Sequence, residues 1–334
     1  MAELRRDPIV GRWVIINTDN PLILKDFEKE NHAWRKGECV FCYGNEYMTP
    51  IEIEAFRMEG TKPNSPGWQV RVIPNKFPAL QIEGSLERKG LGIYDMSNGI
   101  GAHEVIIDTP YHDKNIPDLL DEEVTDILKM YCNRSTDLIK DDRFKYIMIF
   151  KNYGPAAGAS LEHPHSQLIA LPMVPKNVAE ELKGAANFFE YRERCIFCDI
   201  VSQEMQDKTR IVAENDDFIA FCPFVPRFAF EVWVLPKAHQ ASFPAAYESE
   251  EKIASLARLL KEVLLRLKIA LQDPAFNYII HTAPVYDIDR ESYHWHFEIM
   301  PTLTRVAGFE WGTGFYVVPT PPELSAKYLR EVKL

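Results

Sequence analysis

Short runs in which apolar residues gather or alternate with polar ones recur along the chain and predict β-strands. They cover residues 12–16, 68–73, 103–107, 146–150, 218–222, 230–235, 278–280 and 295–300. Apolar residues at helical spacing predict helices over residues 116–140, 176–194 and 250–271. The helix at 176–194 is expected to join two halves of like order, whereas the polar residues 21–67 predict loops.

A direct comparison of two segments supports a duplication. Residues 103–112 align without a gap with residues 230–239 and share a glutamate, a valine and the final histidine. Elements that recur in one order within a chain indicate a repeated structural unit. We therefore predict two related domains, at residues 1–190 and 191–334.

Each half also contains, in order, a C-x-x-C pair, a lone histidine after a strand and an H-x-H pair. Two thiolates and two imidazoles make a tetrahedral zinc site, and a closed site of four protein ligands is structural. The predicted ligands are Cys39, Cys42, His112 and His163 in the first half, and Cys195, Cys198, His239 and His294 in the second.

Cysteine pairs of this kind have other interpretations. A redox pair would open a helix after a strand, which neither pair does in this pattern, and a zinc ribbon needs a second pair about 15–20 residues on. Here the gap is 195 − 42 = 153 positions. Buried free cysteines are a third alternative. In the second half, a different ligand set is available in His281, His294 and His296 with a carboxylate such as Glu181.

The candidate chemistry lies where a glycine-containing loop runs into a predicted strand. His163, His165 and Gln167 alternate along this strand, so we expect them to share one face. Gly154 and Gly158 in the loop would let backbone N–H groups approach an anion. One imidazole can be held by a neighbour while the next attacks phosphorus as a neutral nucleophile. Surface histidines after a turn are the plainer alternative.

Composition narrows the class of protein. The 334 residues carry a net charge of −11, which argues against a nucleic-acid binder but not against a small anionic ligand. No apolar run approaches the ~20 residues that span a bilayer, and the start of the chain shows no signal peptide. We therefore expect a cytoplasmic protein without disulfides, in which Cys132 and Cys222 are core residues.

The loop, residues 163–167 and both metal patterns resemble the galactose-1-phosphate uridylyltransferase family, a duplicated branch of the histidine-triad superfamily, over nearly the whole chain. The resemblance implies an α+β fold with two related histidine-triad-like halves. Each half would have an antiparallel sheet flanked by helices. It also implies a homodimer.

The same resemblance implies roles for individual residues. The ring of His165 would attack the α-phosphorus of a nucleoside diphosphate sugar, and a sugar 1-phosphate or phosphate would then take the nucleotide from the histidine. Gln167 would hydrogen-bond the phosphoryl group and favour transfer over hydrolysis. Residues matched to nucleotide, phosphate or sugar contacts are Asn75, Asn152, Ser160, Phe309 and Glu310.

Departures from the family pattern bear on the substrate. Ser166 replaces a usual glycine, Lys76 replaces an aspartate of some members, and residues 308–314 also resemble a sister group, the ADP-glucose phosphorylases. Our hypothesis is a ping-pong uridylyltransferase of galactose metabolism that uses UDP-glucose and galactose 1-phosphate. The alternatives are an ADP-glucose phosphorylase, which transfers adenylate to phosphate, and an inactive, zinc-stabilised nucleotide-sugar binding protein.

Overall fold

The chain is described by a computed structural model for residues 1–27, 29 and 37–334. Within this part, the first half contributes to the main sheet the strands β3 (Glu54–Arg57), β4 (Trp68–Pro74), β7 (Ala102–Ile107), β8 (Tyr146–Tyr153) and β9 (His165–Leu171). The second half contributes β10 (Ile211–Glu214), β11 (Phe218–Phe221), β12 (Val232–Pro236), β13 (Phe276–His281) and β14 (His296–Pro301).

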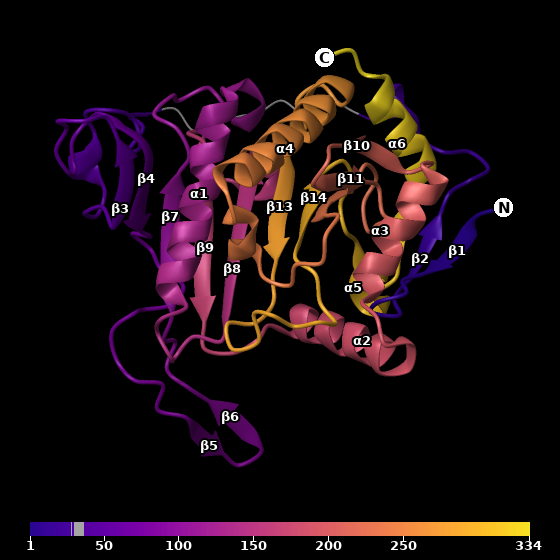
Figure 1. Ribbon diagram of the computed structural model, residues 1–334, viewed down its shortest axis with the longest axis horizontal. Coiled ribbons are helices and arrows are strands. Elements are labelled where there is room, and N and C mark those ends of the chain that lie inside the picture. The colour runs from indigo at the N-terminus through magenta and orange to yellow at the C-terminus, as the bar shows by residue number, and fades with distance from the viewer. Residues whose placement is uncertain (28, 30–36) are drawn as a thin grey trace.

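These strands form one continuous antiparallel sheet rather than two (Figure 1). Its order is β10-β11-β12-β14-β13-β8-β9-β7-β4-β3. The order reads the same from either edge once each strand is replaced by its counterpart in the other half. The seam is the β8–β13 pair, in which Asn152 lies opposite Asn277. The sheet confirms the predicted duplication and shows that the halves share one hydrogen-bonded structure.

Two long helices cover one face of this sheet, α1 (Asp121–Leu138) and α4 (Glu250–Ala270) (Figure 1). Acidic residues lie in the first turn of each helix, where their negative charge interacts favourably with the positive end of the helix dipole. The Ser249 hydroxyl caps α4 by accepting a hydrogen bond from the Lys252 N–H at 3.2 Å. Their apolar faces pack on alternate strand residues, including Ile106, Leu168 and Val234. Cys132 and Cys222 lie in this core, as predicted.

The opposite face is covered over the second half by α2 (Lys176–Arg192) and α3 (Ile196–Asp207), and over the first half by the loop that contains Phe41. Here the other strand residues, such as Phe221, Trp233 and Leu235, pack with α2 and α3. The α2 helix confirms the predicted connection between the halves. The α3 helix was not predicted, and Cys195 is its N-cap, so the second C-x-x-C pair does open a helix, although it follows a helix and not a strand.

The remaining elements lie at the periphery. The strands β1 (Glu3–Arg6), β2 (Trp13–Ile16) and β15 (Tyr316–Val318) form a small sheet, in which a segment from the C-terminal part of the chain pairs with the N-terminal hairpin. A hairpin of β5 (Lys89–Leu91) and β6 (Tyr94–Met96) projects from the body (Figure 1). Two further helices follow β14 along the chain, α5 (Gly308–Thr313) and α6 (Pro322–Glu331).

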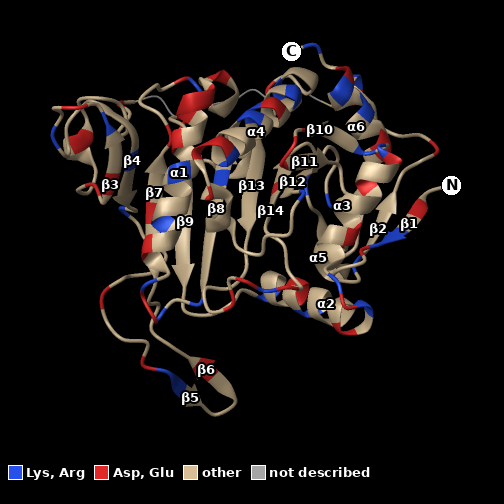
Figure 2. Ribbon diagram, viewed as in Figure 1, with Lys and Arg blue, Asp and Glu red and all other residues tan. Residues whose placement is uncertain are grey.

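Two sequence expectations are affected by these findings. The strand β3 falls within residues 21–67, which were expected to form loops, while residues 28 and 30–36 of that stretch lie outside the described residues. None of the helices in the described chain has the length and apolar character that a bilayer span requires. Acidic and basic residues are interspersed along α1, α4 and α6 (Figure 2).

Candidate active site and metal clusters

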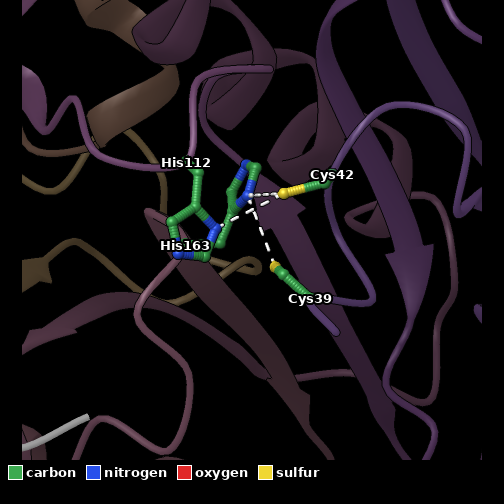
Figure 3. Close-up of side chains that lie close together, drawn as sticks. All are labelled: Cys39, Cys42, His112 and His163. Carbon is green, nitrogen blue, oxygen red and sulfur yellow. Dashed lines mark hydrogen bonds between the residues drawn. The ribbon is translucent and has the colours of Figure 1, made fainter. Parts of the chain in front are cut away.

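The four predicted ligands of the first zinc site come together at one end of the first half (Figure 3). Cys42 Sγ lies 3.4 Å from His112 Nδ1, and His163 Nδ1 lies 3.6 Å from Cys39 Sγ and 3.7 Å from Cys42 Sγ. Tetrahedral zinc with bonds of about 2.3 Å to sulfur and about 2.0 Å to nitrogen would set such atoms about 3.5 Å apart. The spacing therefore fits a zinc ion.

The protonation of this cluster also fits a metal. The Nε2–H of His163 donates to the Thr109 carbonyl at 2.8 Å, which leaves Nδ1 as the ligand atom. Burial lowers the pKa of His163 to about 4, so the ring is neutral. Burial and the neighbouring thiol of Cys39 raise the pKa of Cys42 to about 11. A cation bound between the two sulfurs would offset this repulsion and allow both cysteines to ionise at neutral pH.

The second predicted set is arranged in the same way. Cys198 Sγ lies 3.4 Å from His239 Nδ1 and 3.7 Å from His294 Nδ1, and the four ligand atoms of the set, including Cys195 Sγ, lie within 4.8 Å of one another. The Nε2–H of His294 donates to the Pro236 carbonyl at 3.0 Å, as His163 does to Thr109. Repetition of the outer hydrogen bond supports the same chemistry at both sites.

The alternative ligand set for the second half is not assembled as expected, because His294 faces the cysteines. A separate group forms instead from Glu181, His281, His296 and Glu298. His281 Nδ1 lies 2.9 Å from Glu181 and its Nε2 lies 3.1 Å from Glu298. Burial alone would lower the pKa of His281, but the two carboxylates raise it to about 10. An imidazolium ring thus supplies positive charge within this group.

His165 is the first residue of β9 and faces a cavity of about 810 Å³. Its Nδ1 lies 2.9 Å from the backbone oxygen of His163, and a carbonyl can only accept, so Nδ1 carries the proton. The Nε2 atom therefore holds a lone pair. Burial, with Lys151 adding to it, lowers the pKa of His165 and keeps the ring neutral. The Phe41 ring meets it edge-on, with centroids 5.5 Å apart.

Several predicted residues line the same cavity as His165, namely Asn75, Ser160 and Gln167, together with Lys76. His165 and Gln167 are two positions apart on β9, so their common face agrees with the expected alternation. His163 precedes the strand and turns into the metal cluster. The cavity wall thus combines a neutral imidazole with amide, hydroxyl and ammonium groups, which suits a phosphorylated ligand.

The loop between β8 and β9 differs from expectation in its hydrogen bonding. Gly154 and Gly158 adopt positive φ angles of 84° and 87°, as glycine allows. The amides of Ala157 and Ala159 both donate to the Gly154 carbonyl at 3.1 Å, so these N–H groups are used within the loop. Side chains, rather than these amides, are the available phosphate donors.

A residue of the second half holds this loop in place. The amide nitrogen of Asn277 on β13 donates to Asn152 Oδ1 at 2.7 Å and to the Ala157 carbonyl at 2.8 Å. Asn152 therefore keeps its own NH₂ group for another acceptor, although it is not among the residues that line the cavity. Sequence reasoning missed Asn277, because no local signal links β13 to a loop 120 positions earlier.

Comparison with known proteins identifies the family. The sequence profile of the N-terminal domain of galactose-1-phosphate uridyl transferase matches residues 2–175. The chain belongs to the galactose-1-phosphate uridylyltransferase family. A second profile, for a domain family of unknown function, matches residues 101–333. The fold and the predicted enzyme class, a nucleotidyltransferase, agree with this membership.

Relatives in the family carry two different names. An ADP-glucose phosphorylase of Arabidopsis thaliana is 36% identical over 339 residues, which cover 99% of this chain and 93% of that protein. A galactose-1-phosphate uridylyltransferase of Thermotoga maritima is 28% identical over 343 residues, covering 100% and 99%. The crystal structure of an A. thaliana ADP-glucose phosphorylase with bound ADP-glucose has a TM-score of 0.83 at 34% identity and covers all of both chains.

Ser166, the departure from the usual family glycine, points away from the cavity. Its hydroxyl lies 3.0 Å from Asp108 Oδ1 and 3.3 Å from the Tyr278 hydroxyl, on the face covered by α1. Asp108 in turn pairs with Lys151 at 2.6 Å, and both side chains are only 1% exposed. Ser166 therefore belongs to a buried polar network behind His165, and the serine cannot contact a base in the cavity.

The predicted sugar contacts do not reach the cavity of their own chain. Phe309 and Glu310 lie on α5, which is well separated from β9 in Figure 1. Neither is among the described residues that line the cavity, and the Phe309 side chain is half exposed. Within the described chain, neither residue therefore reaches the cavity that contains His165.

Proposed function

We propose that the protein transfers a nucleotide from a nucleoside diphosphate glucose through a covalent intermediate on His165. The observation that carries this proposal is the neutral imidazole whose Nε2 lone pair faces the cavity while Nδ1–H is held by the His163 carbonyl. A histidine in this state can form a bond to phosphorus without first losing a proton.

The bonds balance in two steps. In the first step, Nε2 bonds to the α-phosphorus, and the bond from that phosphorus to the bridging oxygen breaks, which releases glucose 1-phosphate. In the second step, an oxygen of the acceptor phosphate attacks the same phosphorus and returns the electron pair to Nε2. Gln167, Ser160 and Asn75, which line the cavity, would supply hydrogen-bond donors, whereas the phosphate contact of Asn152 rests on the family resemblance alone. Positioning of this kind with charge stabilisation accounts for most of phosphoryl-transfer catalysis.

Two donors fit this chemistry. The sequence reading favoured UDP-glucose with galactose 1-phosphate as acceptor. The alternative is ADP-glucose with phosphate. Sequence identity favours it, since the chain is 36% identical to the A. thaliana ADP-glucose phosphorylase and 28% identical to the T. maritima uridylyltransferase. Because Ser166 faces the core, it does not argue for either base. The presence of both His165 and Gln167 argues against an inactive nucleotide-sugar binding protein.

Zinc is proposed at both cysteine–histidine clusters, each closed by four protein ligands. Such an ion fixes the fold of its ligands and has no open position for substrate. His163 would thereby hold the residue two positions before the nucleophile. The free cysteines suit a reducing compartment, and the cytoplasmic location stays a prediction.

A homodimer would account for the position of Phe309 and Glu310. If the α5 segment of one chain enters the cavity of its partner, the predicted sugar contacts are recovered without moving either element within its own chain. The predicted domains 1–190 and 191–334 would then cooperate across the dimer as well as through the shared sheet.

The test is a donor panel with the zinc-loaded protein. ADP-glucose and UDP-glucose are each supplied without acceptor, and released glucose 1-phosphate is measured during the first turnover. A burst that matches the enzyme concentration with one donor supports the covalent step and names the base. Phosphate and galactose 1-phosphate are then added to identify the acceptor. Absence of a burst with both donors would contradict the proposal.

A further inference from the structure

His103 on β7, a histidine that takes no part in the proposed reaction or metal clusters, contacts Gln167. In the β7–β9 pair, Val105 lies opposite Gln167, so His103 is diagonal to Gln167 on the same face of the sheet. His103 Nε2 lies 2.9 Å from Gln167 Oε1. The ring is partly buried and is not among the residues that line the cavity.

The backbone fixes which nitrogen of His103 carries the proton. The N–H of Ala79 donates to His103 Nδ1 at 3.1 Å, so Nδ1 must be the acceptor. A neutral imidazole has a single N–H, which is then on Nε2. This N–H donates to the carbonyl oxygen of Gln167 and cannot accept from its amide nitrogen.

The direction of this hydrogen bond decides how Gln167 presents itself to a ligand. With its oxygen held by His103, the Gln167 side chain directs its NH₂ group elsewhere, and the residue lines the cavity beside His165. The amide nitrogen of Asn75 lies 3.0 Å from the same Nε2, which as a donor cannot accept from it. The Asn75 oxygen is engaged by the Phe77 N–H at 2.9 Å. Both amides therefore keep N–H donors for an anionic ligand.

We propose that His103 is a positioning residue that locks the Gln167 amide with its donors toward the phosphoryl group attacked by His165. This inference rests on the proposed function. It also ties Gln167 to the segment from Asn75 to Ala79, because the same ring accepts from Ala79. Without His103, the amide could rotate by half a turn and present its oxygen to the phosphate, where two acceptors repel.

Two substitutions separate the two nitrogens of the ring. In His103→Asn, the side-chain oxygen can replace Nδ1 as the acceptor for Ala79, but nothing reaches Gln167. In His103→Gln, the longer side chain can place an NH₂ donor near the position of Nε2. Gln167→Ala, alone and combined with His103→Asn, completes a double-mutant cycle.

The measurement is the first-turnover rate of labelling by α-phosphate-labelled ADP-glucose and UDP-glucose, with zinc content and melting temperature as checks on folding. We expect His103→Asn to slow labelling about 10- to 100-fold with little change in donor KM, as for a misplaced transition-state contact. His103→Gln should stay within about threefold of wild type. In the Gln167→Ala background, His103→Asn should cause no further loss, which a general structural role would not predict.

Wild-type rates in His103→Asn would overturn the inference, as would an equal loss with and without Gln167. If His103→Asn fails to fold, a His103→Gln protein as slow as Gln167→Ala would also overturn it. Failure of the wild-type protein to be labelled by either donor would instead contradict the proposed function.

Discussion

The ring of His165 is tied to the backbone of His163, because its Nδ1–H donates to the His163 carbonyl at 2.9 Å. The imidazole of His163 in turn faces Cys39 and Cys42 (Figure 3). His163 therefore connects the first cysteine–histidine cluster to the candidate nucleophile, which lies two positions further along the chain. The orientation of His165 should therefore depend on the integrity of that cluster.

Loss of the first cluster is predicted to impair His165. Cys42→Ser should abolish the zinc binding proposed for the first cluster and slow labelling of His165 by at least about tenfold, in line with the effect of disturbing groups that hold a metal site. The matched control is Cys198→Ser, which alters the equivalent cluster of the second half. It should lower the zinc content equally and leave labelling closer to wild type. Zinc content is measured by elemental analysis. Equal labelling rates in the two variants would contradict the dependence of His165 on the first cluster.

The Lys151–Asp108 pair behind His165 is predicted to matter for stability. The two side chains are 2.6 Å apart and 1% exposed, and Lys151 Nζ also donates to the His165 carbonyl at 3.2 Å. Asp108→Asn should leave Lys151 as an uncompensated buried charge and cost about 3–5 kcal/mol in the free energy of unfolding. The control is Glu87→Gln, which breaks the exposed Lys89–Glu87 pair and should cost about 0–1 kcal/mol. Denaturant titration that gives similar values for both variants would disprove this role.

Substitution of Ser166 is predicted to leave the choice between ADP-glucose and UDP-glucose as donor unchanged. Ser166→Gly removes a hydroxyl that contacts Asp108 and Tyr278, and the loss of these buried hydrogen bonds should cost about 1–3 kcal/mol of stability. Because the side chain faces the helices, the ratio of labelling by ADP-glucose to labelling by UDP-glucose should not change. A switch in that ratio would show that the residue acts on the cavity after all.

Most of the architecture was open to prediction because the duplication repeats local signals. Strands such as 103–107 and the long helices follow from their periodicity, and the repeated cysteines and histidines predict ligand groups that the structure brings together. The short edge strands β3 and β10 were not predicted, because their four residues mix charged and apolar side chains without a clear alternation. The α3 helix was not predicted, because it begins within a cysteine pair that was interpreted as metal ligands and not as part of a helix.

Contacts between the halves could not be predicted in this way. The hydrogen bonds from Asn277 to the β8–β9 loop depend on the pairing of β13 with β8, and nothing in the sequence of either strand specifies that register. Likewise, the outward direction of Phe309 and the inward direction of Ser166 are set by tertiary packing. Family resemblance supplied which residues matter but not which face of the sheet each one occupies.

The position of α5 leads to a prediction about the dimer. We expect Glu310→Ala and His165→Asn chains each to be inactive as pure proteins. If α5 acts in the cavity of the partner, mixed dimers from co-expression should regain activity, because one of their two sites combines an intact His165 with an intact α5. Activity is measured on dimers purified by a different tag on each chain. Mixed dimers without activity would indicate that α5 acts within its own chain, and an active Glu310→Ala protein would show that Glu310 is not required.

The most direct test of the account is to locate the nucleotide on the protein. The zinc-loaded enzyme is incubated with ADP-glucose or UDP-glucose without acceptor, quenched, digested at alkaline pH, where a phosphorus–nitrogen bond survives, and analysed by mass spectrometry. The account predicts a nucleotidyl group on the peptide that contains His165, absent in His165→Asn and removed by the correct acceptor. A nucleotide found on another residue, or turnover of the donor by a His165→Asn protein at the wild-type rate, would contradict it.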